Sequence, residues 1–385
     1  MPQISSTARS IPGSGIRRIF ELAAALPDVI QLSVGEPEAR VAPHILEAGA
    51  KAWQNDATNY TPNSGLLLLR SAIVTKLAEF NNYAVDEDQV HITAGGSQAL
   101  HMAMLLTLDA GDEILVPDPG YTTFSMSPRM LSAVPVPYAL RAETGFLPEP
   151  DRIEALVTER TRAIIVNSPS NPLGTMLDES TARALLELAR RHDLWVISDE
   201  VYEALTWAGP HVSLAAIDSI ATGGRGGRVM GVFSTSKTYA MTGVRVGWLT
   251  VPEGLSDTLR TVQEAMISCV AAPDQRAAVA ALAGPQDAVL AAREHYRGNL
   301  EAAAALLTER GIRHLVPGGA FYLWIDVSHA AGGDVATWAE GFLREHRVAV
   351  APGSAFGESG EGWIRVCAAS TRADLMHGLS LLPAP

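Results

Sequence analysis

The sequence predicts an α/β protein in which helices cover both faces of a mostly parallel sheet and a smaller α/β unit follows. Three observations predict this fold class. Short apolar runs alternate with helical patterns from about residue 90 to 251, an Ala- and Leu-rich helical region covers residues 255–310, and strand-like runs return after it. Nearly continuous apolar strands separated by helices are typical of parallel sheets that are buried on both faces.

The expected large sheet is built from seven short runs of β-branched and aliphatic residues. These strands are residues 90–93, 113–117, 134–138, 163–167, 195–198, 229–233 and 246–251. Helical patterns lie between several of them, at residues 97–108, 122–131 and 179–192. Ligands of such sheets bind beyond the carboxyl ends of the strands, so polar residues at those ends are the first candidates for a functional site.

The smaller unit is expected near the C-terminus. The helical region before it is broken near Pro273 and Pro285, because proline ends or kinks a helix. Strand-like runs follow at residues 321–327, 348–350 and 363–366, and helical patterns at residues 335–345 and 371–382.

Composition excludes several classes of protein. The chain has 385 residues, of which 47% are apolar and 18% charged, so it is neither disordered nor collagen-like. A net charge of −13 opposes general attraction to nucleic acid or anionic membranes, and neither is an expected partner. Cys269 and Cys367 have no metal-ligand spacing, so no metal site is predicted. We expect a cytoplasmic location, because the sequence shows neither a signal-peptide pattern nor an apolar run of membrane-spanning length.

Lysine is rare in this chain, which restricts a reactive amine to Lys51, Lys76 and Lys237. Lys237 follows a predicted buried strand in the run Phe-Ser-Thr-Ser-Lys, where a solvated surface charge is a poor explanation. Burial and nearby cations would lower its pKa and free the amine to form a Schiff base. The same letters match the S-x-x-K of serine acyl-enzymes, but the S-D-N and K-T-G partners of that motif are missing.

Other strand ends also deliver polar residues. Asp199 follows strand 195–198, where a catalytic carboxylate would lie, although on its own it could equally cap the next helix. The Gly-Gly-Ser-Gln run at residues 95–98 is a turn at a helix start, and its free N–H groups suit a phosphate. It is neither G-x-G-x-x-G nor a P-loop, which disfavours a dinucleotide or a nucleoside triphosphate. The Asn-Pro-Leu-Gly run at Asn171 indicates by itself only a turn. Since four strand ends should converge, we expect these residues to share one crevice.

Together these motifs resemble the class I and II aminotransferases, which are fold type I pyridoxal phosphate enzymes of the aspartate aminotransferase superfamily. The resemblance covers about residues 14–382 and rests on three motifs: N-P-x-G at Asn171, D-x-x-Y at Asp199, and S-x-S-K at Lys237 with Arg245 eight residues later. It implies a large domain over residues 45–280 with a seven-stranded, mostly parallel sheet. Residues 1–44 and 281–385 would form the small domain.

The resemblance implies that pyridoxal 5′-phosphate is bound as a Schiff base on Lys237, whose amine would also move the α-proton of the substrate. Asp199 would pair with the pyridine nitrogen, and Tyr121 would stack on the ring. Asn171 and Tyr202 would hydrogen-bond the phenolic oxygen of the ring. The phosphate would be held by Gly96, Ser97, Gln98, Ser234, Ser236 and Arg245.

Substrate contacts are implied in the same way. Arg365 alternates with apolar neighbours on strand 363–366, so it either reaches solvent or binds an anion. By resemblance it binds the substrate α-carboxylate, together with Asn171, and Gly35 lets the backbone approach that carboxylate. Tyr60 matches a tyrosine that reaches the phosphate of a neighbouring subunit, which implies a homodimer with shared active sites. Without the family, Tyr60 is only a loop aromatic.

The resemblance favours transfer of the amino group from an L-amino acid to a 2-oxo acid in a ping-pong cycle. A carbon–sulfur β-lyase and an inactive or regulatory relative are the alternatives, because the cofactor motifs do not decide which bond is broken. A regulator usually carries a DNA-binding domain, for which the residues before Gly13 are too few. Ser97 stands where some aspartate-preferring relatives carry lysine, which favours a neutral, aromatic or broad preference and leaves aspartate as an open alternative.

Overall fold

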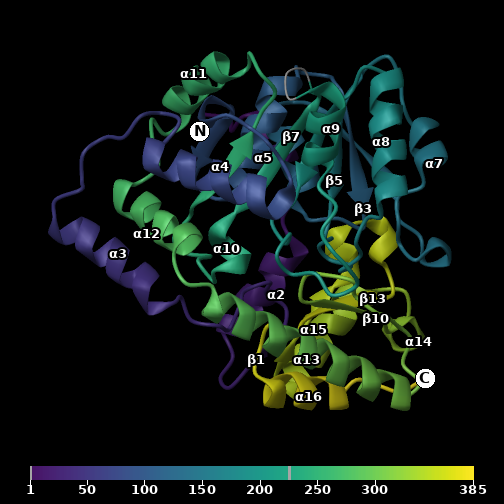
Figure 1. The fold of residues 1–385 in the computed structure, drawn as a ribbon. Helices are drawn as coiled ribbons and strands as arrows, with labels where there is room; N and C mark the ends of the chain where they lie inside the picture. The colour runs from purple at the N-terminus through teal and green to yellow at the C-terminus, as the bar shows by residue number, and fades with distance from the viewer. Residues whose placement is uncertain (1, 224–226) are drawn as a thin grey trace.

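The computed structural model describes residues 2–223 and 227–385, and its main feature is a seven-stranded sheet flanked by helices (Figure 1). Its strands are β2 (Val90–Thr93), β3 (Glu113–Asp118), β4 (Val134–Ala139), β5 (Thr161–Asn167), β6 (Trp195–Asp199), β7 (Val229–Ser234) and β8 (Gly247–Thr250). They lie in the order β2-β8-β7-β6-β5-β3-β4, and β8 runs antiparallel to both of its neighbours. The expected fold class and the seven expected strands are confirmed.

The large sheet separates two apolar cores, because successive side chains of a strand face opposite sides. Ile114 and Val116 belong to one core, whereas Leu115 belongs to the other. The first core includes side chains of α5 (Gly96–Thr107), α6 (Thr123–Met130) and α11 (Ser256–Met266). The second includes α4 (Leu67–Asn81), α8 (Glu179–Arg191) and α9 (Leu214–Thr222). The remaining helices of this part are α3 (Pro43–Gln54), α7 (Pro150–Glu154), α10 (Thr235–Thr238) and α12 (Ala272–Ala283). Burial on both faces explains why the central strands have continuous apolar runs, such as Ala163–Val166 of β5.

A second unit combines both ends of the chain. β10 (Tyr322–Asp326) and β13 (Trp363–Cys367) are the centre of a four-stranded antiparallel sheet whose edges are β12 (Ala351–Pro352) and β9 (His314–Leu315). β1 (Ile30–Gln31) pairs in parallel with β11 (Val348–Ala349), so the N-terminal segment joins the C-terminal part. The helices of these segments are α1 (Ser6–Ser10), α2 (Gly15–Ala24), α13 (Asp287–Glu309), α14 (Ser328–Ala331), α15 (Val335–His346) and α16 (Arg372–Ser380). The division into residues 45–280 and 1–44 with 281–385 stays a prediction, and the β1–β11 pairing agrees with it.

Some local expectations need correction. The strand expected over residues 348–350 is split into β11 and β12, which belong to different sheets. Asp199 is the last residue of β6, and Ser213 caps the next described helix, α9, by accepting a hydrogen bond from the Ala216 N–H. The capping alternative for Asp199 is therefore wrong. None of the helices among the described residues combines the length and the apolarity needed to cross a bilayer.

Candidate active site

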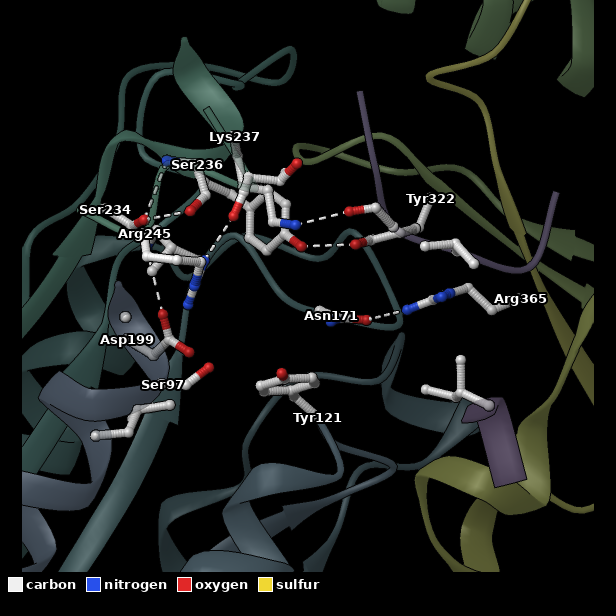
Figure 2. Close-up of a pocket in the computed structure, with 18 residues that line it drawn as sticks. Ser97, Tyr121, Asn171, Asp199, Ser234, Ser236, Lys237, Arg245, Tyr322 and Arg365 are labelled. Atoms are coloured by element: carbon white, nitrogen blue, oxygen red, sulfur yellow. Dashed lines mark hydrogen bonds between the residues drawn. The ribbon is translucent and has the colours of Figure 1, made fainter. Parts of the chain in front are cut away.

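A cavity of about 330 Å³ lies where polar residues from the ends of several strands meet (Figure 2). Residues from β6 and β7 of the large sheet line it, and so do residues from β10 and β13 of the second unit. Twelve of the residues predicted from the sequence contribute to its wall: Gly35, Gly96, Ser97, Tyr121, Asn171, Asp199, Tyr202, Ser234, Ser236, Lys237, Arg245 and Arg365. The structure thus brings the predicted motifs together in one crevice.

Lys237 projects into this cavity from the one-turn helix α10, directly after β7. Ser234 caps the turn by accepting a hydrogen bond from the Ser236 N–H at 3.0 Å. The Lys237 ammonium donates to the carbonyl oxygen of Gly35 at 2.6 Å. Burial, together with the nearby guanidinium groups of Arg365 and Arg245, lowers the pKa of Lys237 to about 8. About a tenth of the amine is therefore neutral at pH 7, far more than for an ordinary lysine.

Asp199 ends β6 and is buried at the floor of the cavity. Its carboxylate accepts a hydrogen bond from the Val201 N–H at 3.3 Å, and in the described part of the chain no ion pair involves it. Burial raises its pKa to about 7, and the neighbouring Glu200 raises it as well. A buried acid without a cationic partner is suited to a ligand that brings an N–H donor or a positive charge.

Hydroxyl groups, backbone N–H groups and one arginine gather at one end of the cavity. Gly96 and Ser97 begin α5, whose first N–H groups have no partner within the helix. Arg245 donates to the carbonyl of Thr242 at 2.7 Å and approaches Gly95 so closely that a Cβ there would collide with its guanidinium. Gly95 also has a φ of 79°, a conformation that L-residues rarely adopt. This combination of a helix N-terminus with a fixed cation suits a phosphate.

Gln98 does not line the cavity. Its side-chain oxygen accepts a hydrogen bond from the Ala94 N–H at 2.5 Å, and its amide donates to Gln263 at 3.2 Å. Gln98 therefore supports the turn before α5 with its side chain, and only its backbone N–H stays available for the predicted phosphate contact.

Arg365 reaches the opposite end of the cavity from β13. It is 2% exposed, donates to Asn171 Oδ1 at 2.8 Å and also hydrogen-bonds the Ser33 carbonyl. Its guanidinium carbon lies 4.4 Å from the ring centre of Tyr322, and its buried Nε has no partner among the described residues. Of the two alternatives for Arg365, the structure selects the one that faces a buried site.

Tyr322, in the strand-like run expected over residues 321–327, is a wall residue that the sequence motifs do not predict. Its hydroxyl is 2.6 Å from that of Tyr202, and burial raises the pKa of both phenols. A Cβ on Gly35 would collide with this Tyr322 hydroxyl, so glycine is required for the approach of the two segments. The periodicity of β10 predicts a strand but not whether Phe321 or Tyr322 faces the cavity.

Tyr121 and Ile16 belong to the wall of the cavity, whereas Tyr60 does not. Tyr121 lies across the cavity and packs edge-on against Phe124 with ring centres 5.7 Å apart. Ile16, from α2, also lines the cavity, so the N-terminal segment contributes to the site. Tyr60 lies outside this cavity and is 90% exposed, so its predicted role depends on a second subunit.

Comparison with known proteins identifies similar chains. The model of the family "Aminotransferase class I and II" matches residues 27–382. An aspartate aminotransferase of Pyrococcus horikoshii is 32% identical and covers 96% of this chain, with 94% of the relative matched. An aromatic-amino-acid aminotransferase of Thermococcus litoralis is 32% identical, with 98% of this chain and 96% of the relative matched. A solved Thermus thermophilus aspartate aminotransferase mutant superposes with a TM-score of 0.92 at 31% identity, over 99% of this chain and 98% of the other.

Proposed function

Since the chain belongs to the class I and II aminotransferases, a family of enzymes that depend on pyridoxal phosphate, we propose that it moves the α-amino group of an L-amino acid to a 2-oxo acid in a ping-pong cycle. The observation that carries this proposal is that Lys237, Asp199 and Arg365 face one cavity. When bound, pyridoxal phosphate supplies an aldehyde that accepts the amino group and a ring that withdraws electrons from the substrate Cα.

The cavity fits this cofactor in its charges and in its shape. The phosphate would be held by Ser97, Ser234, Ser236 and Arg245. These residues lie at the end of the cavity next to Gly95, where a Cβ would collide with the Arg245 guanidinium. The carboxylate of Asp199 would receive the N–H of a protonated pyridine nitrogen, which would stabilise its ionised form. Tyr121 would cover one face of the ring.

The side-chain nitrogen of Lys237 would have two roles, attachment of the cofactor and transfer of the substrate α-proton. Its buried amine, with a pKa of about 8, would attach to the cofactor aldehyde. Once released by the substrate, Nζ would take the proton from the substrate Cα and return it on the cofactor side. The Gly35 carbonyl, at 2.6 Å, orients this nitrogen in the cavity.

Arg365 would fix the substrate by its α-carboxylate. Its guanidinium already donates to Asn171 Oδ1 and the Ser33 carbonyl, which hold its plane in one orientation. Planar, preoriented donors match the two oxygens of a carboxylate. Substrate binding at this end and phosphate binding at Arg245 would set the direction of the substrate in the cavity.

We also propose a homodimer in which Tyr60 serves the neighbouring subunit. Tyr60 is 90% exposed, and Trp53 on α3 is 64% exposed, which is unusual for large apolar side chains. Other exposed apolar side chains follow on α3, on α4 and after α11: Leu46, Leu67, Leu68 and Ile267. A second copy would cover these side chains and complete the phosphate site.

We expect a neutral, aromatic or broad preference, because Ser97 contributes no positive charge for a second carboxylate. The test is the absorption spectrum of the cofactor-loaded protein before and after single amino acids are added without any oxo acid. Conversion of the bound aldehyde cofactor to its amine form supports transamination, and the best donors name the substrate class. Release of pyruvate or ammonia would instead identify a β-lyase, and a spectrum that no amino acid changes would identify an inactive relative.

A further inference from the structure

A second cavity of about 500 Å³ lies next to the first and has no role in the proposed chemistry. It is enclosed by α6, by residues 12–15 of the N-terminal segment, and by the stretch that contains the 3-10 helices η3 (Gly353–Phe356) and η4 (Glu358–Gly360). Tyr121 lines both cavities, and the consecutive residues Gly15 and Ile16 line one each. The two cavities therefore share the wall at Tyr121.

One face of α6 forms a polar wall of this second cavity. Thr122, Ser125, Met126 and Arg129 follow at i, i+3, i+4 and i+7, the spacing of one helical face, and all four line the cavity. Seven residues lie between Tyr121 and Arg129, and the helical part of this stretch, which begins at Thr123, rises about 9 Å. Helical side chains lean in general toward the helix N-terminus, which is the Tyr121 end of this wall.

Arg129 is the cation of this wall and lacks an intramolecular partner. Its Nε is buried without a hydrogen-bond partner among the described residues, and the ion pairs found between described residues do not include it. Arg365 Nε is likewise buried without a partner, but its other guanidinium nitrogens donate to Asn171 and the Ser33 carbonyl, whereas no hydrogen bond between described residues involves the half-buried Arg129 side chain. An unpaired buried N–H group is costly, and a carboxylate from a ligand would remove that cost.

Two acids line the same cavity and would oppose an anion near them. Asp118 accepts a hydrogen bond from the Ser359 N–H at 3.1 Å, and burial raises its pKa. Glu358 is exposed, so water screens its charge. Asp118 lies three residues before Tyr121, and Glu358 begins η4. Arg129 lies about two helical turns after Tyr121, near the end of α6.

We propose that the second cavity is a side-chain subsite for amino acids with long side chains that end in a carboxylate, and that Arg129 binds this carboxylate. This inference rests on the proposed transamination, because the α-carboxylate must be held at Arg365 for the side chain to point past Tyr121. It adds one class of substrate to the expected neutral, aromatic or broad preference. Short acidic side chains would find no cation at Ser97, whereas long acidic side chains would reach Arg129. Length of the side chain would then decide whether a second negative charge is accepted.

Binding can be measured without any reaction by calorimetry of the cofactor-loaded protein with glutarate, adipate and pimelate. Each is compared with the monocarboxylate of equal length: valerate, hexanoate and heptanoate. In the wild type, we expect the affinity ratio of dicarboxylate to monocarboxylate to grow with length and to reach about tenfold. In R129M this affinity ratio should fall to about one at every length, and in R129K it should lie between the values of R129M and the wild type. R183M, which removes an exposed arginine paired with Glu179 on α8, should behave as the wild type.

A ratio that is flat in the wild type, or that is equal in the wild type and R129M, overturns the subsite. In the amino-transfer assay, R129M should lower kcat/KM for 2-aminoadipate and 2-aminopimelate about tenfold more than for alanine, and an equal loss for all three also contradicts it. If the wild type accepts no amino donor, the proposed function fails, while the calorimetry still decides whether Arg129 binds the distal carboxylate. If near-UV circular dichroism shows that R129M is misfolded, R129K replaces it in both comparisons.

Discussion

Replacement of Arg365 by alanine tests the assigned α-carboxylate site most directly. A bidentate contact supplies two charge-assisted hydrogen bonds of about 1.5–3 kcal/mol each, so about 3–6 kcal/mol of substrate binding depends on this guanidinium. At 1.4 kcal/mol per factor of ten, kcat/KM should fall by roughly 10²- to 10⁴-fold. All amino acids share the α-carboxylate, so alanine, aspartate and phenylalanine should lose similar factors.

The assay is the rate of the cofactor absorbance change with each amino acid as sole substrate, over a range of concentrations. Arg365→Lys should lose less, because it keeps the charge but not the planar pair of donors. Arg313→Ala is the matched control, since this exposed arginine of the second unit pairs with Asp326 at 3.7 Å. A loss confined to one amino acid would place Arg365 in the side-chain pocket and refute the assignment.

Three further predictions follow from buried lysines. Lys237→Ala should abolish turnover while circular dichroism and the thermal midpoint stay near wild type; normal turnover in this variant would contradict the role of the lysine. The pKa of about 8 at Lys237 predicts that the rate of cofactor attachment to the cofactor-free protein rises with pH and levels off above about 8, because only the neutral amine attacks; a rate that keeps rising toward pH 10 would indicate an ordinary lysine. Lys76 pairs with the buried Glu203 and contacts the ring of Phe233, so Lys76→Met should lower stability by about 3–5 kcal/mol, seen as an earlier thermal transition. Adding Glu203→Gln to Lys76→Met should recover part of this loss, and a double variant as unstable as the single one would show that the unpaired carboxylate is not the cause.

The sequence predicts the large sheet well because its strands are buried on both faces. β5 and β7 each contain a nearly continuous apolar run, so strand and helix patterns separate clearly. The motif residues at the ends of these strands then meet in space, since parallel strands deliver their carboxyl ends to one edge. Short strands of the second unit are less certain, because β11 and β12 are two residues each and divide where one run was expected.

Side-chain direction is what the sequence predicts poorly. Gln98 belongs to the motif of the phosphate turn, yet its amide turns toward Gln263 and holds the turn from behind. Tyr322 is one of two adjacent aromatic residues, and only the register of β10 against β13 decides that its hydroxyl meets Tyr202. Arg129 belongs to no motif. Its position becomes informative once the fold places the polar face of α6 beside Tyr121.

The distribution of charge explains how an acidic protein can offer sites for two anionic groups, the proposed cofactor phosphate and the proposed substrate α-carboxylate. The net charge is −13, but the walls of the first cavity carry Lys237, Arg245 and Arg365 against the single carboxylate of Asp199. Arg245 comes from the large unit and Arg365 from the second unit, and the 2.8 Å hydrogen bond from Arg365 to Asn171 connects the two. Within one chain, the proposed phosphate site would therefore be built by the large unit, whereas the proposed substrate site would also depend on where the second unit lies. A change that loosens contact between the units should thus weaken amino-acid binding more than cofactor binding, because only the α-carboxylate site is built from both.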